Sequence, residues 1–229
     1  MFIHDDKFLH KLPTVTSTTH DTRGRVYTCD LSGNHPVAYP SITTILGTTK
    51  DKAPLENWRK RVGLAEAEKV TKRASKHGNA IHDKLERYLK NESVSSEGEM
   101  PKETMVFNQV TPYLDKHITK IYAQEAGLYS FGLGVAGRVD LVAAWDGVPS
   151  IIDFKTSLRA KKEEWILDYY LQATAYKIMW EEHTRLHIPQ IIVLITAQDG
   201  TVQLFKKPAD KYVTPLLTRV AKYKLDHTV

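Results

Sequence analysis

The sequence predicts an α/β fold in which helices flank a central mixed β-sheet. Two observations lead to this prediction. Segments with helical periodicity alternate with short β-rich runs, and the run at 191–197 is apolar except for Thr196, as in a strand buried on both faces. A helical lobe precedes the predicted sheet, and a β-hairpin precedes the lobe. We expect one integrated domain with an N-terminal hairpin extension at 1–40, a basic helical lobe at 41–119 and the core at 120–229.

Local patterns predict the individual elements. Turn residues and β-rich runs predict a hairpin within 14–40, with its turn at 31–34, and a second hairpin at 138–156. Pro54 opens a helix, and apolar residues at helical spacing predict a second helix that ends near Leu89. The remaining predicted elements are a short segment at 41–46, helices at 102–118 and 163–182, strands at 121–130, 191–197 and 202–206, and a last helix after Pro208.

Composition excludes several classes of protein. Cys29 is the only cysteine, so the chain has no internal disulfide and cannot by itself supply a cysteine-based zinc or iron–sulfur site. No apolar run approaches the length of a membrane span, and the N-terminus has acidic residues where a signal peptide would be apolar. We therefore expect a cytoplasmic protein of a bacterium or of a phage-infected cell.

Gly132, Gly134 and Gly137 have the G-x-G-x-x-G spacing of a dinucleotide-binding loop. Such a loop must follow a strand and open a helix, so that the helix N-terminus receives the pyrophosphate. Here the glycines lead into two β-rich runs separated by the turn Asp146-Gly147. The pattern therefore favours a turn before a hairpin, and it argues against a dinucleotide-dependent oxidoreductase.

The hairpin brings candidate active-site residues together. With a two-residue turn at Asp146-Gly147, the numbers of cross-strand partners sum to 293, which sets Asp140 opposite Asp153. Lys155 points to the same face as Asp153, because side chains alternate along a strand. The sequence thus predicts a cluster of two carboxylates and one lysine.

Two facing carboxylates repel each other, so the fold must protonate one of them or provide a cation. Carboxylate oxygens at this spacing suit Mg²⁺ or Mn²⁺. A neighbouring lysine can hold an attacking water or stabilise the charge that builds up on a phosphate. The alternative is an ion-paired hairpin face without chemistry. Ile151, Ile152 and Phe154 weaken that alternative, because unpaired charge is costly in a buried strand.

Basic residues are concentrated before the predicted sheet. The net charge is +5, but residues 50–90 contain twelve Lys or Arg against six Asp or Glu. A solvated helix face is the ordinary alternative, whereas beside a metal site such a segment favours a surface for the phosphate backbone of nucleic acid. Trp58 and Tyr88 offer rings on which bases could stack. The candidate DNA-binding residues are Arg59, Lys60, Arg61, Lys72, Arg73, Lys76 and Trp58.

Two helices carry further polar candidates. His82 and Glu86 lie four residues apart and share a helix face, so His82 could bind a metal with Glu86 close behind it. The alternative is a packed or exposed structural histidine. Gln172 and Tyr176 have the same spacing on the helix after the second hairpin. Core packing accounts for the tyrosine but accounts poorly for the glutamine.

The motifs, taken in order, resemble a known family. "GRVD", "DFK" and Gln172-x-x-x-Tyr176 follow a helix containing "GNAIH" and a strand containing Glu125. This set resembles the RecB-like branch of the PD-(D/E)XK nucleases. The stretch "YPSITTILGTTKDKAPLENWRKR" is similar to the mitochondrial genome maintenance exonucleases and related phage exonucleases. The resemblance spans roughly residues 39–197, and five ordered motifs are far more specific than any one of them.

The resemblance implies a PD-(D/E)XK nuclease core and a role for each matching residue. The metal would be bound by His82, Asp140, Asp153 and the backbone carbonyl of Phe154, and Lys155 would be the catalytic lysine. Gln172 and Tyr176 would support the active site and the DNA strand, and Glu125 would match the acidic position of the first core strand and contact water on the metal. Val139 stands where many members have proline, which an extended backbone tolerates. The chain lacks the cysteines of the iron–sulfur subgroup and any helicase motif, so a stand-alone nuclease without that cluster is implied.

We therefore expect a Mg²⁺- or Mn²⁺-dependent DNA exonuclease, with one or two ions, that prefers single-stranded DNA with free ends. The alternatives are a catalytically silent nucleic-acid-binding module and a structure-specific endonuclease of the same fold. A silent relative would be expected to lose an aspartate or the lysine, and all are present. No membrane partner is expected, and nothing in the sequence points to a protein partner.

Overall fold

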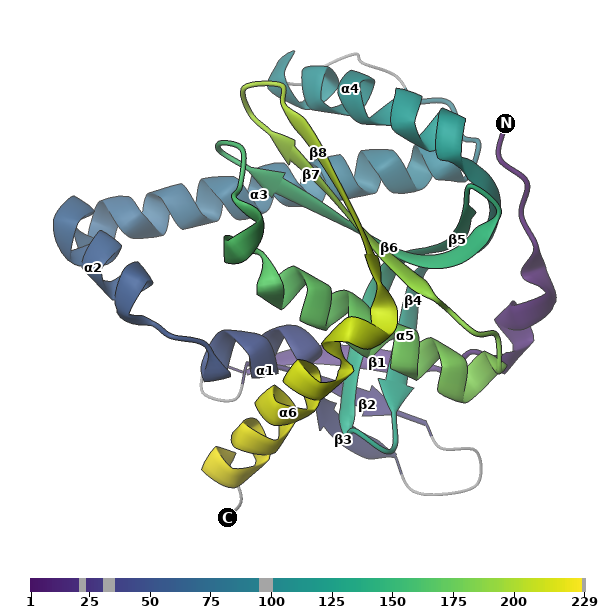
Figure 1. Cartoon of the computed structure of the whole chain (residues 1–229). Coiled ribbons are helices and arrows are strands. Elements are labelled where there is room, and N and C mark those ends of the chain that lie inside the picture. The colour runs from purple at the N-terminus through teal and green to yellow at the C-terminus, as the bar shows by residue number, and fades with distance from the viewer. Residues whose placement is uncertain (21–23, 31–35, 95–100, 228–229) are drawn as a thin grey trace.

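A five-stranded mixed sheet forms the centre of the molecule (Figure 1). The structure, a computed structural model, describes residues 1–20, 24–30, 36–94 and 101–227. Strands β6 and β7 pair in parallel and the other neighbours pair antiparallel, so the predicted mixed sheet is confirmed. In spatial order the strands are β4 (Ile118–Ser130), β5 (Val135–Trp145), β6 (Val148–Ser157), β7 (Gln190–Ala197) and β8 (Val202–Pro208).

Helices cover both faces of this sheet, and alternate strand residues supply the two cores. One face of β5 and β6 contributes Val142 and Ile151 to a core shared with α1, α5 and α6. The other face contributes Leu141 and Ile152 to a core shared with α3 and α4. These helices are α1 (Ile42–Thr49), α3 (Leu64–Leu89), α4 (Pro101–His117), α5 (Leu167–Thr184) and α6 (Val213–His227).

The predicted N-terminal hairpin is part of a three-stranded antiparallel sheet, which packs against the core near β5. Strands β2 (Gly24–Cys29) and β3 (Val37–Pro40) are the expected hairpin strands, and the predicted turn at 31–34 lies outside the described residues. The sequence prediction missed β1 (Val15–His20), which follows the 3₁₀ helix η1 (Asp6–Lys11). Its sequence, VTSTTH, has four consecutive exposed residues and therefore no apolar alternation to indicate a strand.

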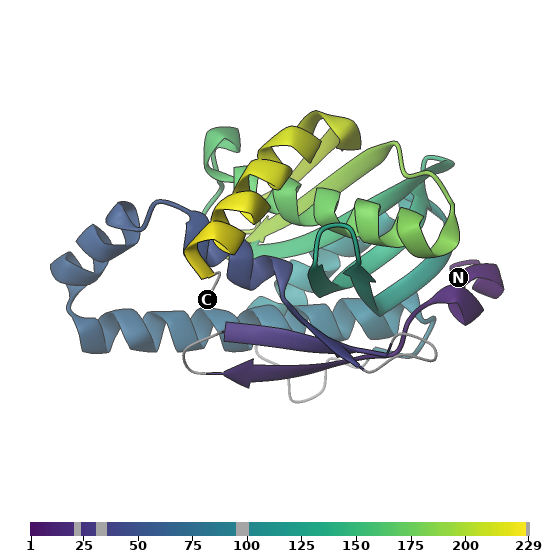
Figure 2. The ribbon, with the colours of Figure 1, turned by 90° about the horizontal axis from the view of Figure 1, so that it is seen from below.

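The chain between α1 and the core forms a projecting arm, defined here as α2 (Ala53–Val62) and residues 64–76 of α3 (Figures 1 and 2). Helix α2 buries none of its residues, and α3 buries only Ala67 within the arm. The C-terminal part of α3 buries Ile81, Leu85 and Leu89 against the sheet. The 26 residues of α3 form a rod about 39 Å long that joins the arm to the core.

Three boundaries differ from the sequence prediction. Residues 163–165 form a separate 3₁₀ turn, η2 (Glu163–Trp165), so α5 begins at Leu167. The segment expected at 41–46 is the full helix α1, capped by the Ser41 hydroxyl, which accepts from the Thr44 amide. A 3₁₀ helix, η3 (Ala209–Tyr212), precedes α6.

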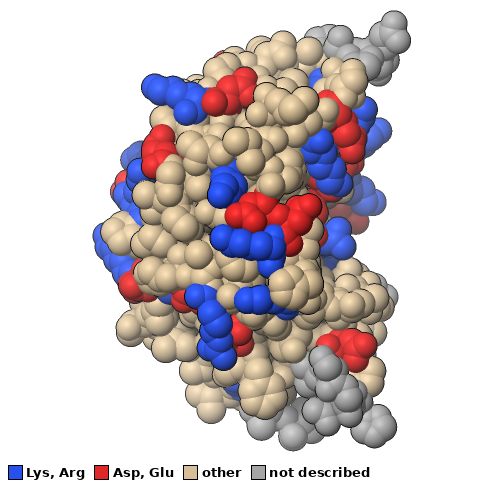
Figure 3. Space-filling view, turned by 90° about the vertical axis from the view of Figure 1, so that its right-hand side faces the viewer, with Lys and Arg blue, Asp and Glu red and all other residues tan. Residues whose placement is uncertain are grey.

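The face on the N-terminal side of the molecule carries Lys and Arg interspersed with Asp and Glu (Figure 3). It lacks a broad region of one sign, in contrast to the excess of basic residues in 50–90. Among the described residues, no helix is both long and apolar enough to cross a membrane.

Candidate active site

Strands β5 and β6 separate at the candidate site. Their ladder pairs Trp145 with Val148 and continues to Leu141 and Ile152, which confirms the predicted register up to that point. The predicted pair of Asp140 with Asp153 is not part of the ladder. Beyond that point the Oδ2 atom of Asp140 accepts a hydrogen bond from the backbone N–H of Phe154 at 2.9 Å. A side chain has thus replaced the next backbone partner, and the ladder ends there.

This separation also exposes the backbone carbonyl of Phe154. Within a strand, the N–H and C=O of one residue point to the same neighbouring strand. Because the N–H of Phe154 points to Asp140, its C=O faces the gap between β5 and β6. Phe154 also lines the cavity described below. The geometry therefore suits the metal-binding role that the resemblance implies for this carbonyl.

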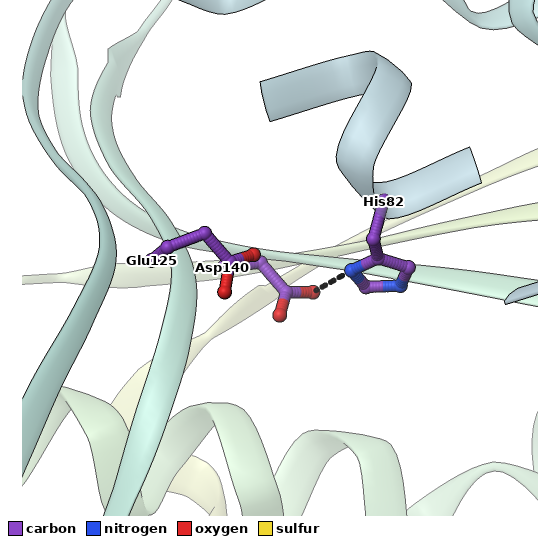
Figure 4. A group of neighbouring side chains, drawn as sticks. All are labelled: His82, Glu125 and Asp140. Carbon is purple, nitrogen blue, oxygen red and sulfur yellow. Dashed lines mark ion pairs between the residues drawn. The ribbon is translucent and has the colours of Figure 1, made fainter. Parts of the chain in front are cut away.

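His82, Glu125 and Asp140 point toward one another from three different elements (Figure 4). Each offers one ligand atom, and these atoms all lie within 4.8 Å of one another. The Nδ1 atom of His82 is 3.7 Å from the Oδ2 atom of Asp140. Helix α3 therefore brings an imidazole to the point where the two strands separate.

Gly78 lets α3 approach β6 closely enough to place His82. A Cβ atom at Gly78 would lie 3.3 Å from the hydroxyl of Thr156, so the helix and strand are nearly in contact here. One helical turn later, the His82 ring stands edge-to-face with Phe154, with 6.3 Å between ring centroids. Close approach and ring packing together orient the histidine.

Glu125 occupies an unusual position in β4. Its φ of 45° lies in the left-handed region, although the neighbouring pairs Gln124 with Leu141 and Ala126 with Val139 remain in register. Burial raises its pKa to about 7, and the negative charges of Asp140 and Glu86 add to this shift. Glu125 was expected only to contact water on the metal, whereas it lies directly in the cluster.

Asp153 and Lys155 form a buried ion pair beside this cluster. The Lys155 Nζ atom is 2.5 Å from the Oδ2 atom of Asp153, whose residue is 1% exposed. Neither carboxylate oxygen has a partner with hydrogen-bond geometry among the described residues. Burial raises the pKa of Asp153, and Asp140 adds to the shift while Lys155 opposes it. Burial alone would lower the pKa of Lys155, but Asp153 and Asp140 outweigh it and raise that pKa.

Gln172 and Tyr176 on α5 complete the side of the site opposite α3. The Gln172 Nε2 group donates to the Tyr176 hydroxyl at 3.2 Å. Burial raises the pKa of Tyr176 well above its ordinary value, and the charges of Asp140 and Asp153 add to this. The phenol therefore keeps its proton and can donate it. Gly137 permits this packing, since a Cβ there would lie 2.7 Å from the Tyr176 ring.

The residues present fit a divalent cation. The cluster supplies two carboxylates and an imidazole, and oxygen-rich sets of this kind suit Mg²⁺ or Mn²⁺. Asp153 adds a buried carboxylate whose Oδ1 atom lacks a hydrogen-bond partner among the described residues, although polar groups are normally satisfied when buried. A cation at this position would compensate the repulsion between these carboxylates.

The site lies in a cavity of about 680 Å³. Helix α3 and the N-terminal sheet form two of its walls, and α1, β4, β5, β6 and α5 contribute the rest. Asp153 is buried behind the lining, whereas Lys155 reaches it.

The predicted DNA-binding residues lie on the arm, outside the cavity lining. The six basic residues are exposed, and Trp58 is half-buried. Tyr88 is engaged elsewhere: its hydroxyl donates to Asp115 at 2.7 Å, and its ring packs edge-on against Phe2 and Phe107. Tyr88 is therefore not available for base stacking.

The family follows from a match over the core. The model of the PD-(D/E)XK nuclease superfamily matches residues 102–222, more than half of the 229 residues. The chain belongs to the PD-(D/E)XK nuclease superfamily. Nucleases of this superfamily act on nucleic acid and use divalent metals, in agreement with the cluster around Asp140. His82 and the N-terminal sheet precede the matched range. The narrower resemblance to the mitochondrial genome maintenance exonucleases remains a prediction.

Among solved structures, a presumed exonuclease from Eubacterium rectale is similar to this chain. The similarity has a TM-score of 0.41 and 10% sequence identity, over 67% of this chain and 69% of that one. At this level of similarity we base no conclusion on it. Curated protein sequences gave no match.

Proposed function

We propose that this nuclease is a divalent-metal-dependent deoxyribonuclease that removes nucleotides from the ends of single-stranded DNA. The observation that carries the proposal is the position of the cluster of His82, Glu125 and Asp140 inside a walled cavity. A site at the floor of such a cavity is reached more easily by a flexible strand end than by the middle of a rigid duplex.

The proposed metal ligands are His82, Asp140, Asp153 and the Phe154 carbonyl, and the geometry adds Glu125 to this set. When bound, a Mg²⁺ or Mn²⁺ ion would stabilise the negative charge that develops on the phosphate and on the leaving oxygen. The protein itself contributes rigid placement. Asp140 is fixed by the Phe154 amide, and His82 is held by the packing of α3 on β6.

Lys155 is the proposed catalytic lysine. Its raised pKa keeps the ammonium group charged at neutral pH, and only 19% of its side chain is exposed. A buried ammonium group next to the scissile phosphate can orient the attacking water and stabilise the charge that develops as the P–O bond breaks. The Tyr169 ring, 5.4 Å from Nζ, limits the directions that the group can take.

The arm supports single-stranded DNA as the preferred substrate. Its exposed basic residues form an extended positive surface next to the cavity, which suits the phosphate backbone of single-stranded DNA. Ala74 and Ser75 of the arm line the cavity, so the arm reaches the cavity edge.

One assay tests the proposal. Purified protein is incubated with 5′- or 3′-labelled linear single strands, blunt duplex and circular single strands, in Mg²⁺, Mn²⁺ or EDTA. We expect metal-dependent loss of linear single strands first, with circles resistant. Equal cutting of circles and linear strands would indicate an endonuclease. Binding without cleavage in either metal would indicate the silent module, although every candidate catalytic group is present.

A further inference from the structure

Both acidic and basic residues line the cavity. Asp83 and Glu86 of α3 join the candidate metal ligands in the lining. The lining also contains Arg25 of β2 and Arg138 of β5, and Arg138 lies beside Glu125. The hydroxyl residues of the lining are Ser17, Ser41 and Thr43.

Ser41 joins the strand that carries Arg25 to the core. Its backbone N–H donates to the carbonyl of Arg25 at 2.9 Å, and Ser41 also forms a parallel bridge with Ala136 of β5. Ser41 is only 2% exposed. Arg25 on β2 and Arg138 on β5 therefore belong to one connected backbone network, with Asp140 two residues beyond Arg138.

The start of β2 is also joined to helix α1. The Arg25 amide donates to the Thr44 hydroxyl at 3.0 Å, and that hydroxyl donates to the Arg25 carbonyl at 3.3 Å. Gly24 has a φ of +69°, and a Cβ there would lie 2.7 Å from the Thr44 side chain. The backbone of Arg25 is thus held on both sides, so the Cα atom from which its side chain extends has a fixed position.

Neither guanidinium group has a close ion pair among the described residues. That of Arg25 has no hydrogen-bond or ion-pair partner there. Within the same residues Arg138 has one ion pair, 4.0 Å from Nη1 to the Oε2 atom of Glu125, and 56% of its side chain is exposed. Donors of this kind are suited to a phosphate, because the planar guanidinium binds two oxygens at once.

We propose that Arg25 and Arg138, with the hydroxyl groups of Ser17 and Thr43, bind a non-scissile phosphate of the strand being cut. This inference rests on the proposed function, because it concerns the neighbour of the phosphate at the metal cluster. A strand in the cavity must place one phosphate at the cation, and the carboxylates beside it repel the next. Arg25 and Arg138 supply positive charge in the same cavity. A cavity of about 680 Å³ falls within the range of about 300–1,000 Å³ that accommodates small ligands, which leaves room for an adjacent phosphate.

The phosphate site would set the position of the cut. Because β2 and β5 are joined through Ser41, the distance from Arg25 to Asp140 is fixed by backbone contacts. The proposed site reads charge at one backbone position and makes no use of the bases, so it determines which linkage is cut in any sequence.

The test uses single-stranded oligonucleotides in which one linkage at a time is a neutral methylphosphonate. Binding by anisotropy in EDTA and single-turnover cleavage in Mn²⁺ are measured for the wild type and for Arg25→Gln, Arg25→Lys and Arg138→Gln. Arg87→Gln is the matched control, since Arg87 is half-exposed and lies outside the cavity lining.

For the wild type and Arg87→Gln, we expect one non-scissile linkage at which the neutral substitution weakens binding about tenfold or more. Arg25→Gln should bind unmodified DNA correspondingly more weakly and lose its sensitivity at that linkage alone, with Arg25→Lys in between. An identical sensitivity profile in the wild type and Arg25→Gln would overturn the phosphate site. If the wild type cuts none of the strands, the proposed function fails, while the anisotropy series still decides the phosphate site.

Discussion

The side chain of Asp140 replaces a strand partner for Phe154: its Oδ2 atom accepts the Phe154 amide hydrogen at 2.9 Å. This bond joins a candidate metal ligand to the backbone of the next candidate ligand. It also ends the pairing of β5 with β6 beyond Leu141 and Ile152. Structural and catalytic roles of Asp140 can therefore be separated by substitution.

Asp140→Asn should keep the fold and lose the metal. The amide oxygen of asparagine can still accept from Phe154, but the negative charge is gone. We expect near-native thermal unfolding, loss of Mn²⁺ binding by calorimetry and loss of cleavage. Asp140→Ala should also lose about 1–3 kcal/mol of stability, because the Phe154 amide is left without its partner. Wild-type Mn²⁺ affinity in Asp140→Asn would contradict the assignment.

Lys155→Ala should lower the single-turnover cleavage rate at saturating DNA by about 10²–10³-fold or more, with little change in DNA affinity. Lys177→Met is the matched control, because Lys177 is a buried lysine that pairs with Glu181 and Asp210 outside the cavity. Lys177→Met should lower the stability of the fold and leave the cleavage rate per folded molecule unchanged. Weaker binding with an intact rate in Lys155→Ala would show that the lysine serves affinity instead.

Gly78→Leu should reduce activity without unfolding the protein. A side chain at Gly78 meets the Thr156 hydroxyl and pushes α3 away from β6, which displaces His82 one turn later. Gly47→Ala on α1 is the contrasting variant, since nothing lies within 4 Å of a Cβ there. It should raise stability by up to about 1 kcal/mol and leave activity unchanged. Full Mn²⁺ affinity in Gly78→Leu would show that His82 needs no close approach.

Reversing the charge of Arg59, Lys60 and Arg61 should weaken binding of single-stranded DNA and flatten its salt dependence. Every phosphate that the arm no longer neutralises lowers the slope of log affinity against log salt by about 0.7. The control reverses Lys206, Lys207 and Lys211, which lie on β8 and η3, away from the arm. An unchanged salt slope in the arm variant would show that these arm residues do not contact DNA phosphates.

The turn between β5 and β6 should respond to acid. The His117 Nδ1 group donates to Asp146 at 2.7 Å and lowers the pKa of that carboxyl below its ordinary value, a shift that Lys206 reinforces. A depressed pKa stabilises the fold above the unfolded value of about 3.9, and this stabilisation is lost as pH falls through the folded pKa. Asp146→Asn, which keeps the turn, should therefore be less stable than wild type in urea unfolding at pH 6 and differ less near pH 2.5. An equal difference at both pH values would contradict this.

The register of the central hairpin could be predicted because the Asp146-Gly147 turn determines every pair up to Leu141 and Ile152. The end of that ladder could not, since it depends on a side chain competing with the backbone. Glu125 was predicted to contact water on the metal, but its place within the cluster itself could not be predicted, because β4 has two register shifts before it and a left-handed residue at it. Such bulges leave no mark in a hydrophobic pattern.

The site residues that the sequence did not reveal are those whose position depends on tertiary contacts. Arg138 lies inside the "GRVD" motif, but only the cavity shows what its side chain faces. Arg25 lies on a strand that was predicted, yet its relation to the site depends on Ser41, which joins β2 to β5. The serine and threonines of the "YPSITT" stretch form these contacts, but the sequence does not indicate that their partner is β2.

Helix α3 carries the arm at one end and His82 near the other, and it is continuous over 26 residues. A rod of this kind acts as a lever, so a small tilt at the arm shifts the imidazole relative to Asp140. DNA held on the arm and a cation held by His82 should therefore influence each other's affinity, and thermodynamic linkage makes that influence reciprocal. If the coupling is positive, the nuclease binds its metal most tightly when a strand already lies on the arm, and the active site is then completed only in the presence of substrate.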